Sequence, residues 1–264
     1  MTVLFGLSSA ILYALDDLLA QKLTRLHGVV RVLCSVMAIS TLIVVPLALG
    51  ADGLPTTSAQ WHGVMYAAAA GALYLGTWFT LLRALQIGDL SIVAPLSSLE
   101  GLLTALFAVA NGQAFTSLLA VGIALASVGV LLAAAPGRAQ SARGAGWALL
   151  TSALWSLAMI CFNQAEDISW LSQAAWSRMT GFVLLVPIAL VVLKRSRGID
   201  QNRASALPSA GITIRLLAAY GGTAVLDLGG LAAMTLALAH GPLAVAGVTI
   251  SQYATVAVIL GLVF

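Results

Sequence analysis

Long apolar stretches of about 20 residues follow one another along the chain, separated by short polar breaks. A helix needs this length to cross the hydrocarbon core of a bilayer. The stretches are continuously apolar and lack the alternation that is typical of a transmembrane barrel. The pattern therefore predicts an all-α, polytopic membrane protein. Spans are expected near residues 3-21, 30-49, 62-85, 90-110, 116-135, 145-165, 172-193, 214-238 and 242-264.

Composition agrees with this prediction and excludes other classes of protein. Hydrophobic residues make up 61% of the chain and charged residues 8%, whereas about a quarter of a soluble domain is charged. The basic residues lie between apolar stretches and form no single patch, so nucleic acid is not an expected partner. The sequence contains no nucleotide-binding glycine loop, zinc-ligand spacing or nucleophile motif. We therefore expect neither an enzyme nor an ATP-driven pump, and no cofactor or metal.

An internal repeat limits the topology further. Residues 73-98 align with residues 226-251 at a constant offset of 153, with eight identities in 26 positions. VPLAL at 45-49 also resembles VPIAL at 186-190, and SAILYAL near residue 12 resembles SALWSL near residue 154.

The repeat places five spans in its first copy, and an odd number of spans inserts the second copy upside down in the membrane. The sequence thus predicts two inverted repeats, at residues 1-138 and 139-264. Nine of the ten helices are expected to be present, because the chain stops where the fifth helix of the second copy would begin.

The sequences LRALQIGDLSIVAPLSSLEGLLTALF (82-107) and NGQAF (111-115), within two five-helix halves, resemble the EamA-type ten-helix transporters of the drug/metabolite transporter superfamily. Ser98, Leu99 and Glu100 match a Ser-Leu-Glu-Pro stretch that is frequent in helix four of this family, although Gly101 replaces the proline. The Gly-Glu pair that usually ends that helix is also absent. The resemblance implies a carrier of small organic molecules and names no substrate.

Inverted repeats are typical of secondary transporters, whose substrate site lies where the repeats meet near the membrane midplane. We therefore predict a secondary transporter that moves a small organic metabolite or drug across the cytoplasmic membrane by alternating access. Proton exchange is the coupling we expect, and uncoupled facilitation is the nearest variant. The alternatives are a non-transporting membrane subunit, a lipid-handling protein, or a truncated inactive fragment. A monomer and a homodimer are both compatible with the sequence.

The distribution of basic residues predicts the orientation. Of twelve Lys and Arg residues, eleven lie in the odd-numbered connections between spans, and only Arg178 lies on the other side. Because cytoplasmic connections carry an excess of Lys and Arg, the odd-numbered connections are expected in the cytoplasm and Met1 outside. Many members of the family that the chain resembles are thought to have their N-terminus inside the cell, so the charge pattern and the resemblance disagree on this point.

Acidic residues within the predicted spans are the first candidates for a site, because a carboxylate at this depth is costly unless it is neutral, paired or hydrated. Glu100 and Asp227 lie deep in their spans, and no cationic residue is near Asp227 in the sequence. Asp17 lies on one polar stripe with Tyr13, Gln21 and Thr24. Proton exchange through Glu100, Asp227 or Asp17 is the predicted coupling. A structural role is the alternative for each, and Asp16 is expected to pair with Lys22 or Arg25.

Four further residues are predicted to contact the solute. Tyr74 is the repeat counterpart of Asp227, and Trp78 lies one turn beyond Tyr74, so both rings could stack on a ligand. Gln252 and Tyr253 occupy the repeat positions of Leu99 and Glu100 and are expected to face the same cavity from the other half. Packing is the alternative for these side chains, and Arg178 is expected to reach the headgroups of the bilayer.

Overall fold

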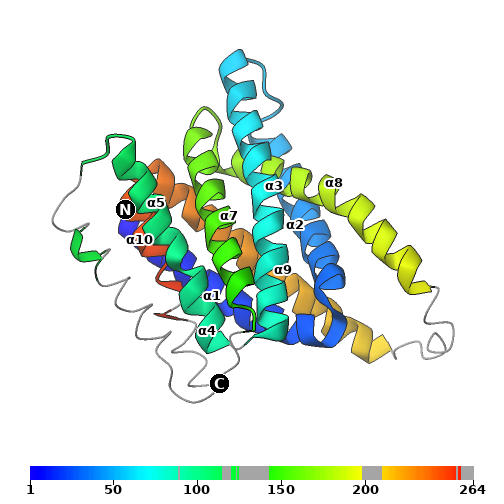
Figure 1. Ribbon diagram of the computed structural model, residues 1–264. Helices are drawn as coiled ribbons and strands as arrows, with labels where there is room; N and C mark the ends of the chain where they lie inside the picture. Colours follow the sequence, from blue (N-terminus) through cyan, green and yellow to red (C-terminus); the bar gives the residue numbers. More distant parts are fainter. Residues whose placement is uncertain are drawn as a thin grey trace.

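The computed structural model describes residues 1–88, 90–114, 120–122, 124, 143–197, 210–253 and 255–256. These residues form helices and no strand (Figure 1). Seven stretches among them are long and apolar enough to cross a membrane. The prediction of an all-α polytopic membrane protein is therefore confirmed. The helices are α1 (Thr2–His27), α2 (Val29–Ala51), α3 (Ser58–Ile87), α4 (Leu90–Ser97), α5 (Leu99–Ala110), α7 (Ala145–Gln164), α8 (Trp170–Arg197), α9 (Ala210–Ala239) and α10 (Leu243–Ile250).

Local sequence explains where several helices begin and end. Gly28 has a φ of 81°, a backbone conformation that glycine adopts readily, and it separates α1 from α2. Thr57 and Gln60 form a capping box that starts α3. The predicted span at 116-135 lies outside the described residues, apart from residues 120–122 and 124. The last predicted span is described as α10, together with residues 251–253 and 255–256.

The span predicted at 90-110 is found as one apolar segment, Ile92–Ala110, and it contains a local turn at Ser98 between α4 and α5. Pro95 lacks an amide hydrogen, and the Ser98 hydroxyl donates to the Pro95 carbonyl at 2.8 Å. A matching break follows α10, where the Ser251 hydroxyl donates to the Val248 carbonyl at 2.9 Å. Ser98 and Ser251, like residues 95 and 248, are separated by the repeat offset of 153. The same local turn thus interrupts a helix at corresponding positions of the two copies.

The helices of the two copies are interleaved in space (Figure 1). α3 packs along α7, and α1 packs along α9. A Cβ atom at Gly76 in α3 would lie 3.2 Å from Leu154 of α7, and one at Gly229 in α9 would lie 3.3 Å from Leu12 of α1. Gly76 and Gly229 are repeat counterparts, and small residues let helices approach closely within a bilayer. The two contacts between copies are therefore built alike.

Repeat counterparts also contact one another directly. The Tyr74 hydroxyl of α3 donates to Asp227 of α9 at 2.5 Å, across the offset of 153. A guanidinium nitrogen of Arg178 in α8 lies 3.8 Å from the sulfur of Met37 in α2, across the offset of 141 that relates VPLAL to VPIAL. Residues that touch their own counterparts lie beside an axis of approximate two-fold symmetry. These contacts agree with two inverted copies, although the domain bounds 1-138 and 139-264 stay a prediction.

Candidate functional site

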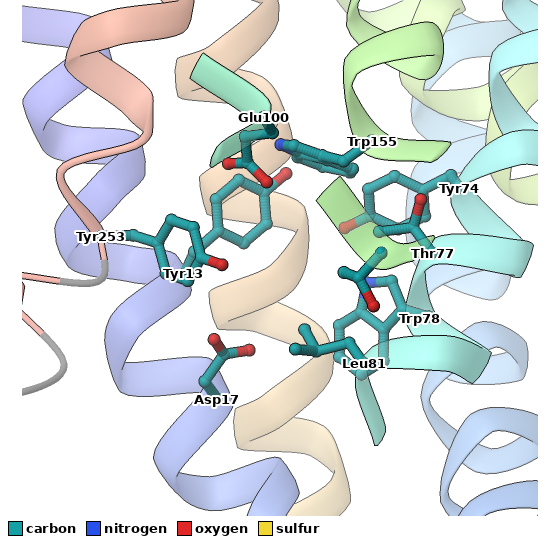
Figure 2. A pocket seen from close by; sticks show the side chains of 10 residues that line it. Tyr13, Asp17, Tyr74, Thr77, Trp78, Leu81, Glu100, Trp155 and Tyr253 are labelled. Atoms are coloured by element: carbon teal, nitrogen blue, oxygen red, sulfur yellow. The ribbon is translucent and has the colours of Figure 1, made fainter. Parts of the chain in front are cut away.

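A small cavity lies between α1, α3, α5 and α7, close to the turn that follows α10 (Figure 2). It leaves about 30 Å³ for the centres of water-sized molecules. That space suffices for roughly two or three waters. The conformation described is therefore contracted around the cavity. The lining residues are Tyr13, Asp17, Tyr74, Thr77, Trp78, Leu81, Glu100, Thr151, Trp155 and Tyr253.

Aromatic residues make up half of the lining residues of the cavity. The ring centre of Trp155 lies 4.8 Å from that of Tyr74 and 5.5 Å from that of Tyr13, and the latter pair meets edge to face. Trp78 continues the series, with its ring 6.4 Å from Tyr74. Tyr253 supplies a further ring from the turn after α10. Because these rings come from both copies, the wall is complete only where the copies meet.

Two carboxyl groups face this aromatic wall. Figure 2 shows Glu100 at one end of the cavity and Asp17 at the other, with the rings between them. Glu100 is 2% exposed, and its Oε1 atom has no hydrogen-bond partner. The break at Ser98 places Glu100 in the first turn of α5, directly after the interruption. The cavity thus contains a buried carboxyl group with unused hydrogen-bonding capacity.

The predicted site residues Asp17, Tyr74, Trp78, Glu100 and Tyr253 all line this cavity. Gln252 does not line it, and its side-chain amide instead donates to the Val248 carbonyl at 3.2 Å. Adjacent side chains of a helix point about 100° apart, so Gln252 and Tyr253 do not share a direction.

Asp227 is held in an ion pair that the sequence did not reveal. Its Oδ2 atom lies 3.0 Å from an Arg178 nitrogen, and its Oδ1 atom accepts the hydrogen bond from Tyr74. Both charged side chains are buried, with Arg178 1% exposed. The expectation that Arg178 reaches the headgroups is therefore wrong, and the cation that neutralises Asp227 comes from a distant part of the sequence. The partners are 49 residues apart on different helices, so proximity in sequence could not indicate their pairing.

Arg178 is kept outside the cavity by Tyr74. The centre of its guanidinium lies 4.2 Å from the centroid of the Tyr74 ring, at a distance typical of a cation–π contact. Tyr74 therefore contacts both members of the ion pair and also lines the cavity that contains Asp17 and Glu100.

Asp16 is fully buried, and neither of its carboxyl oxygens has a hydrogen-bond partner. Its expected pairing with Lys22 or Arg25 is not observed in the described part of the chain. α1 continues to His27 without a bend that would bring those side chains back toward Asp16.

The sequence reasoning missed Thr77, Leu81, Thr151 and Trp155 as lining residues. Trp155 had a usable signal, because the resemblance of SAILYAL to SALWSL makes it the counterpart of Tyr13. The described residues contain no group of three or more His, Cys, Asp or Glu side chains that could hold a metal ion. The arrangement is suited to binding a small solute, because apolar surface and a few convergent polar groups are the usual composition of such sites.

Comparison with known proteins gives a family match and structural matches, one of which is described below. The family model described as the EamA-like transporter family matches residues 1–135. A chain described only as a crystal structure of a protein aligns with 98% of this chain and 98% of its own length, with a TM-score of 0.54 and 18% sequence identity. At that identity the likeness shows the fold alone. No curated protein matches the sequence.

Proposed function

Because the chain belongs to the EamA-like transporter family, and is thus a membrane transporter of the drug/metabolite type, we propose that it works as a proton-coupled secondary transporter of a small organic solute. The observation that carries the proposal is the aromatic cavity, which is lined from both copies of the repeat and contains the buried carboxyl group of Glu100, whose Oε1 atom has no hydrogen-bond partner. Alternating access of two inverted halves around this cavity is the proposed mechanism.

The interrupted helices support alternating access. Discontinuous helices at corresponding positions of two inverted repeats are typical of secondary transporters, where they flank the substrate site. The breaks at Ser98 and Ser251 lie within two residues of the lining residues Glu100 and Tyr253. A Cβ atom at Gly101 would lie 2.4 Å from the Ser251 hydroxyl, so α5 and the end of α10 touch beside the cavity. Movement at either break would change the shape of the cavity directly.

Contacts at one end of the bundle support a closed state on that side. Asp52, at the end of α2, accepts hydrogen bonds from Ser169 and Ser172 at the start of α8, the second at 2.7 Å. At the same end, the Gln113 side chain accepts from the Ala244 amide at 3.3 Å. The distribution of basic residues assigns this end to the outside of the cytoplasmic membrane, together with Met1. We infer that the state described is closed toward the outside.

Accessibility of the cavity from both sides tests the mechanism. The test uses Thr77→Cys, which lines the cavity, in a background with Cys34→Ala and Cys161→Ala, reconstituted in vesicles of known orientation. A membrane-impermeant maleimide should modify this cysteine from either side. Ser58→Cys, at the exposed start of α3, is the matched control and should react from one side only. Modification of Thr77→Cys from only one side, under pH gradients of both directions, would contradict alternating access.

The proposed coupling makes the cavity acids the proton carriers. Asp17 and Glu100 have no cationic partner among the described residues, whereas Asp227 has Arg178. The fraction of Thr77→Cys that reacts from each side should therefore vary with pH, because a proton changes the charge of the cavity. Glu100→Gln and Asp17→Asn should each flatten this pH dependence, and the exposed Glu166→Gln control should keep it. An unchanged pH profile in both cavity variants would refute proton coupling.

A further inference from the structure

The carboxyl groups that line the cavity are either neutral or negatively charged, according to whether they bind a proton. Asp17 and Glu100 are the ionisable acids among the lining residues, and no Lys, Arg or His lines the cavity in the described part of the chain. The buried cation nearest to it is Arg178, which is neutralised by Asp227 and lies behind the Tyr74 ring. An anionic solute would therefore meet two carboxyl groups without a counter-charge. A cationic solute would supply the missing positive charge.

The rings of the cavity favour the same sign of charge. The face of an aromatic ring is electronegative and attracts an ammonium or guanidinium group, most strongly where water is excluded. Tyr13, Tyr74, Trp78, Trp155 and Tyr253 line the same cavity, and Figure 2 shows these rings between the two carboxyl groups. Tyr74 already binds one cation on its ring, because Arg178 lies against it.

Unused hydrogen-bonding capacity points to a donor on the solute. Glu100 Oε1 and the Tyr13 hydroxyl are buried and have no partner in the described structure. Buried polar atoms in proteins are nearly always satisfied, by protein, water or ligand. The N–H groups of an ammonium would satisfy the carboxyl oxygen and compensate its charge at once.

We propose that the solute of this cavity is an organic monocation that carries an aromatic or similarly apolar body. Its ammonium group binds between Asp17 and Glu100, and its apolar body lies between the rings of Trp155, Tyr74 and Trp78. This inference rests on the function proposed above and specifies the class of its substrate. The cavity widens on binding, because its present space suffices for only roughly two or three waters.

Three probes of equal shape and different charge test the proposal. Phenethylamine, 2-phenylethanol and 3-phenylpropanoate share a phenylethyl body and end in a cationic, a neutral and an anionic group. Their binding to the purified full chain in nanodiscs is measured by calorimetry at neutral pH. The amine should bind about 100-fold more tightly than the alcohol, because it gains both the charge pairing and the ring contact. The acid should not bind.

Variants of the full chain locate the binding. Glu100→Gln and Asp17→Asn should each weaken amine binding by about tenfold or more, since each removes one carboxyl charge. Glu166→Gln, an exposed carboxyl outside the cavity, should bind the amine as the parent chain does. Thermal unfolding of each variant shows whether it is folded. If Glu100→Gln does not fold, Asp17→Asn alone decides the result.

The outcomes separate this inference from the proposed function. Equal or tighter binding of the alcohol or the acid would overturn the cation inference. So would the absence of amine binding at concentrations up to about 10 mM, which is on the order of the weakest useful affinity. Either result would leave two-sided accessibility of Thr77→Cys untouched. Tight amine binding with one-sided accessibility would instead keep the cation site and overturn transport.

Discussion

The buried ion pair of Arg178 and Asp227 yields the sharpest prediction about stability. Asp227→Asn keeps the shape of the side chain and an oxygen that accepts the Tyr74 hydrogen bond, but it leaves the Arg178 charge without a counter-ion. Breaking a buried pair by removing one partner costs about 3–5 kcal/mol. For a chain of this size, the loss corresponds to a fall of roughly 6–20 °C in the unfolding temperature.

The reciprocal variant should cost less. Arg178→Met leaves the Asp227 carboxylate buried, but a carboxyl group can take up a proton and become neutral, whereas arginine stays charged. The double variant removes both charges, and replacing a whole buried pair is often nearly neutral. Its loss of stability should therefore be well below the sum of the two single losses.

Thermal unfolding of the purified chain in one detergent, followed by circular dichroism, measures these differences as a double-mutant cycle. Arg215→Met is the matched control, because Arg215 is exposed at its place in α9. The control should unfold within a degree or two of the parent chain, since exposed substitutions change stability little. The reasoning fails if Asp227→Asn is as stable as the parent chain, or if the single losses simply add in the double variant.

Two further predictions rest on particular contacts, and a third rests on the distribution of basic residues. Gly101→Ala should lower stability by about 1–3 kcal/mol in thermal unfolding, because its Cβ would overlap the facing helix. The control Gly50→Ala meets no atom within 4 Å and should not lower stability. Equal losses in the two variants would contradict the crossing described for α5. Asp52→Ala should increase maleimide labelling of Thr77→Cys from the outside by about twofold to fivefold, since it removes the hydrogen bonds from Ser169 and Ser172. Unchanged labelling would show that these two bonds do not hold the outer end of the bundle closed. An epitope in the 194-208 connection should be reachable only from the cytoplasm, and labelling it on intact cells would reverse the orientation.

Properties that depend on local sequence were predictable. The apolar stretches gave the helices, because length and hydropathy decide which segments cross a bilayer. The repeat identified corresponding positions, and Asp17, Glu100, Tyr74, Trp78 and Tyr253 were found because polar or aromatic side chains stand out in such stretches.

Properties that depend on contacts between distant helices were not predictable from periodicity alone. The direction of Arg178 is set by Asp227 on another helix, and the lining role of Trp155 is set by its position against Tyr74. The turn at Ser98 was missed because apolar composition does not change across it, and because the repeat counterpart of Pro95 is Val248 and not a second proline.

The balance of buried charge connects proton coupling with the cationic solute. Asp16, Asp17, Glu100 and Asp227 are buried acids, and Arg178 is the buried cation in the described structure. Arg178 compensates one acid, and an ionised carboxylate without a counter-charge is costly at this depth. Neutrality of the cavity therefore requires protons when it is empty, and a bound monocation takes the place of about one of them.

This exchange can be measured directly. Phenethylamine added to the purified chain in a weakly buffered solution should release about one proton per amine bound, as read by a pH indicator dye. The double variant with Asp17→Asn and Glu100→Gln has no exchangeable acid in the cavity and should release none, while Glu166→Gln should behave as the parent chain does. Amine binding without proton release would show that the cavity acids are already ionised when empty. The link between solute charge and proton movement would then be lost, because the solute would pair with carboxylates that had no proton to release.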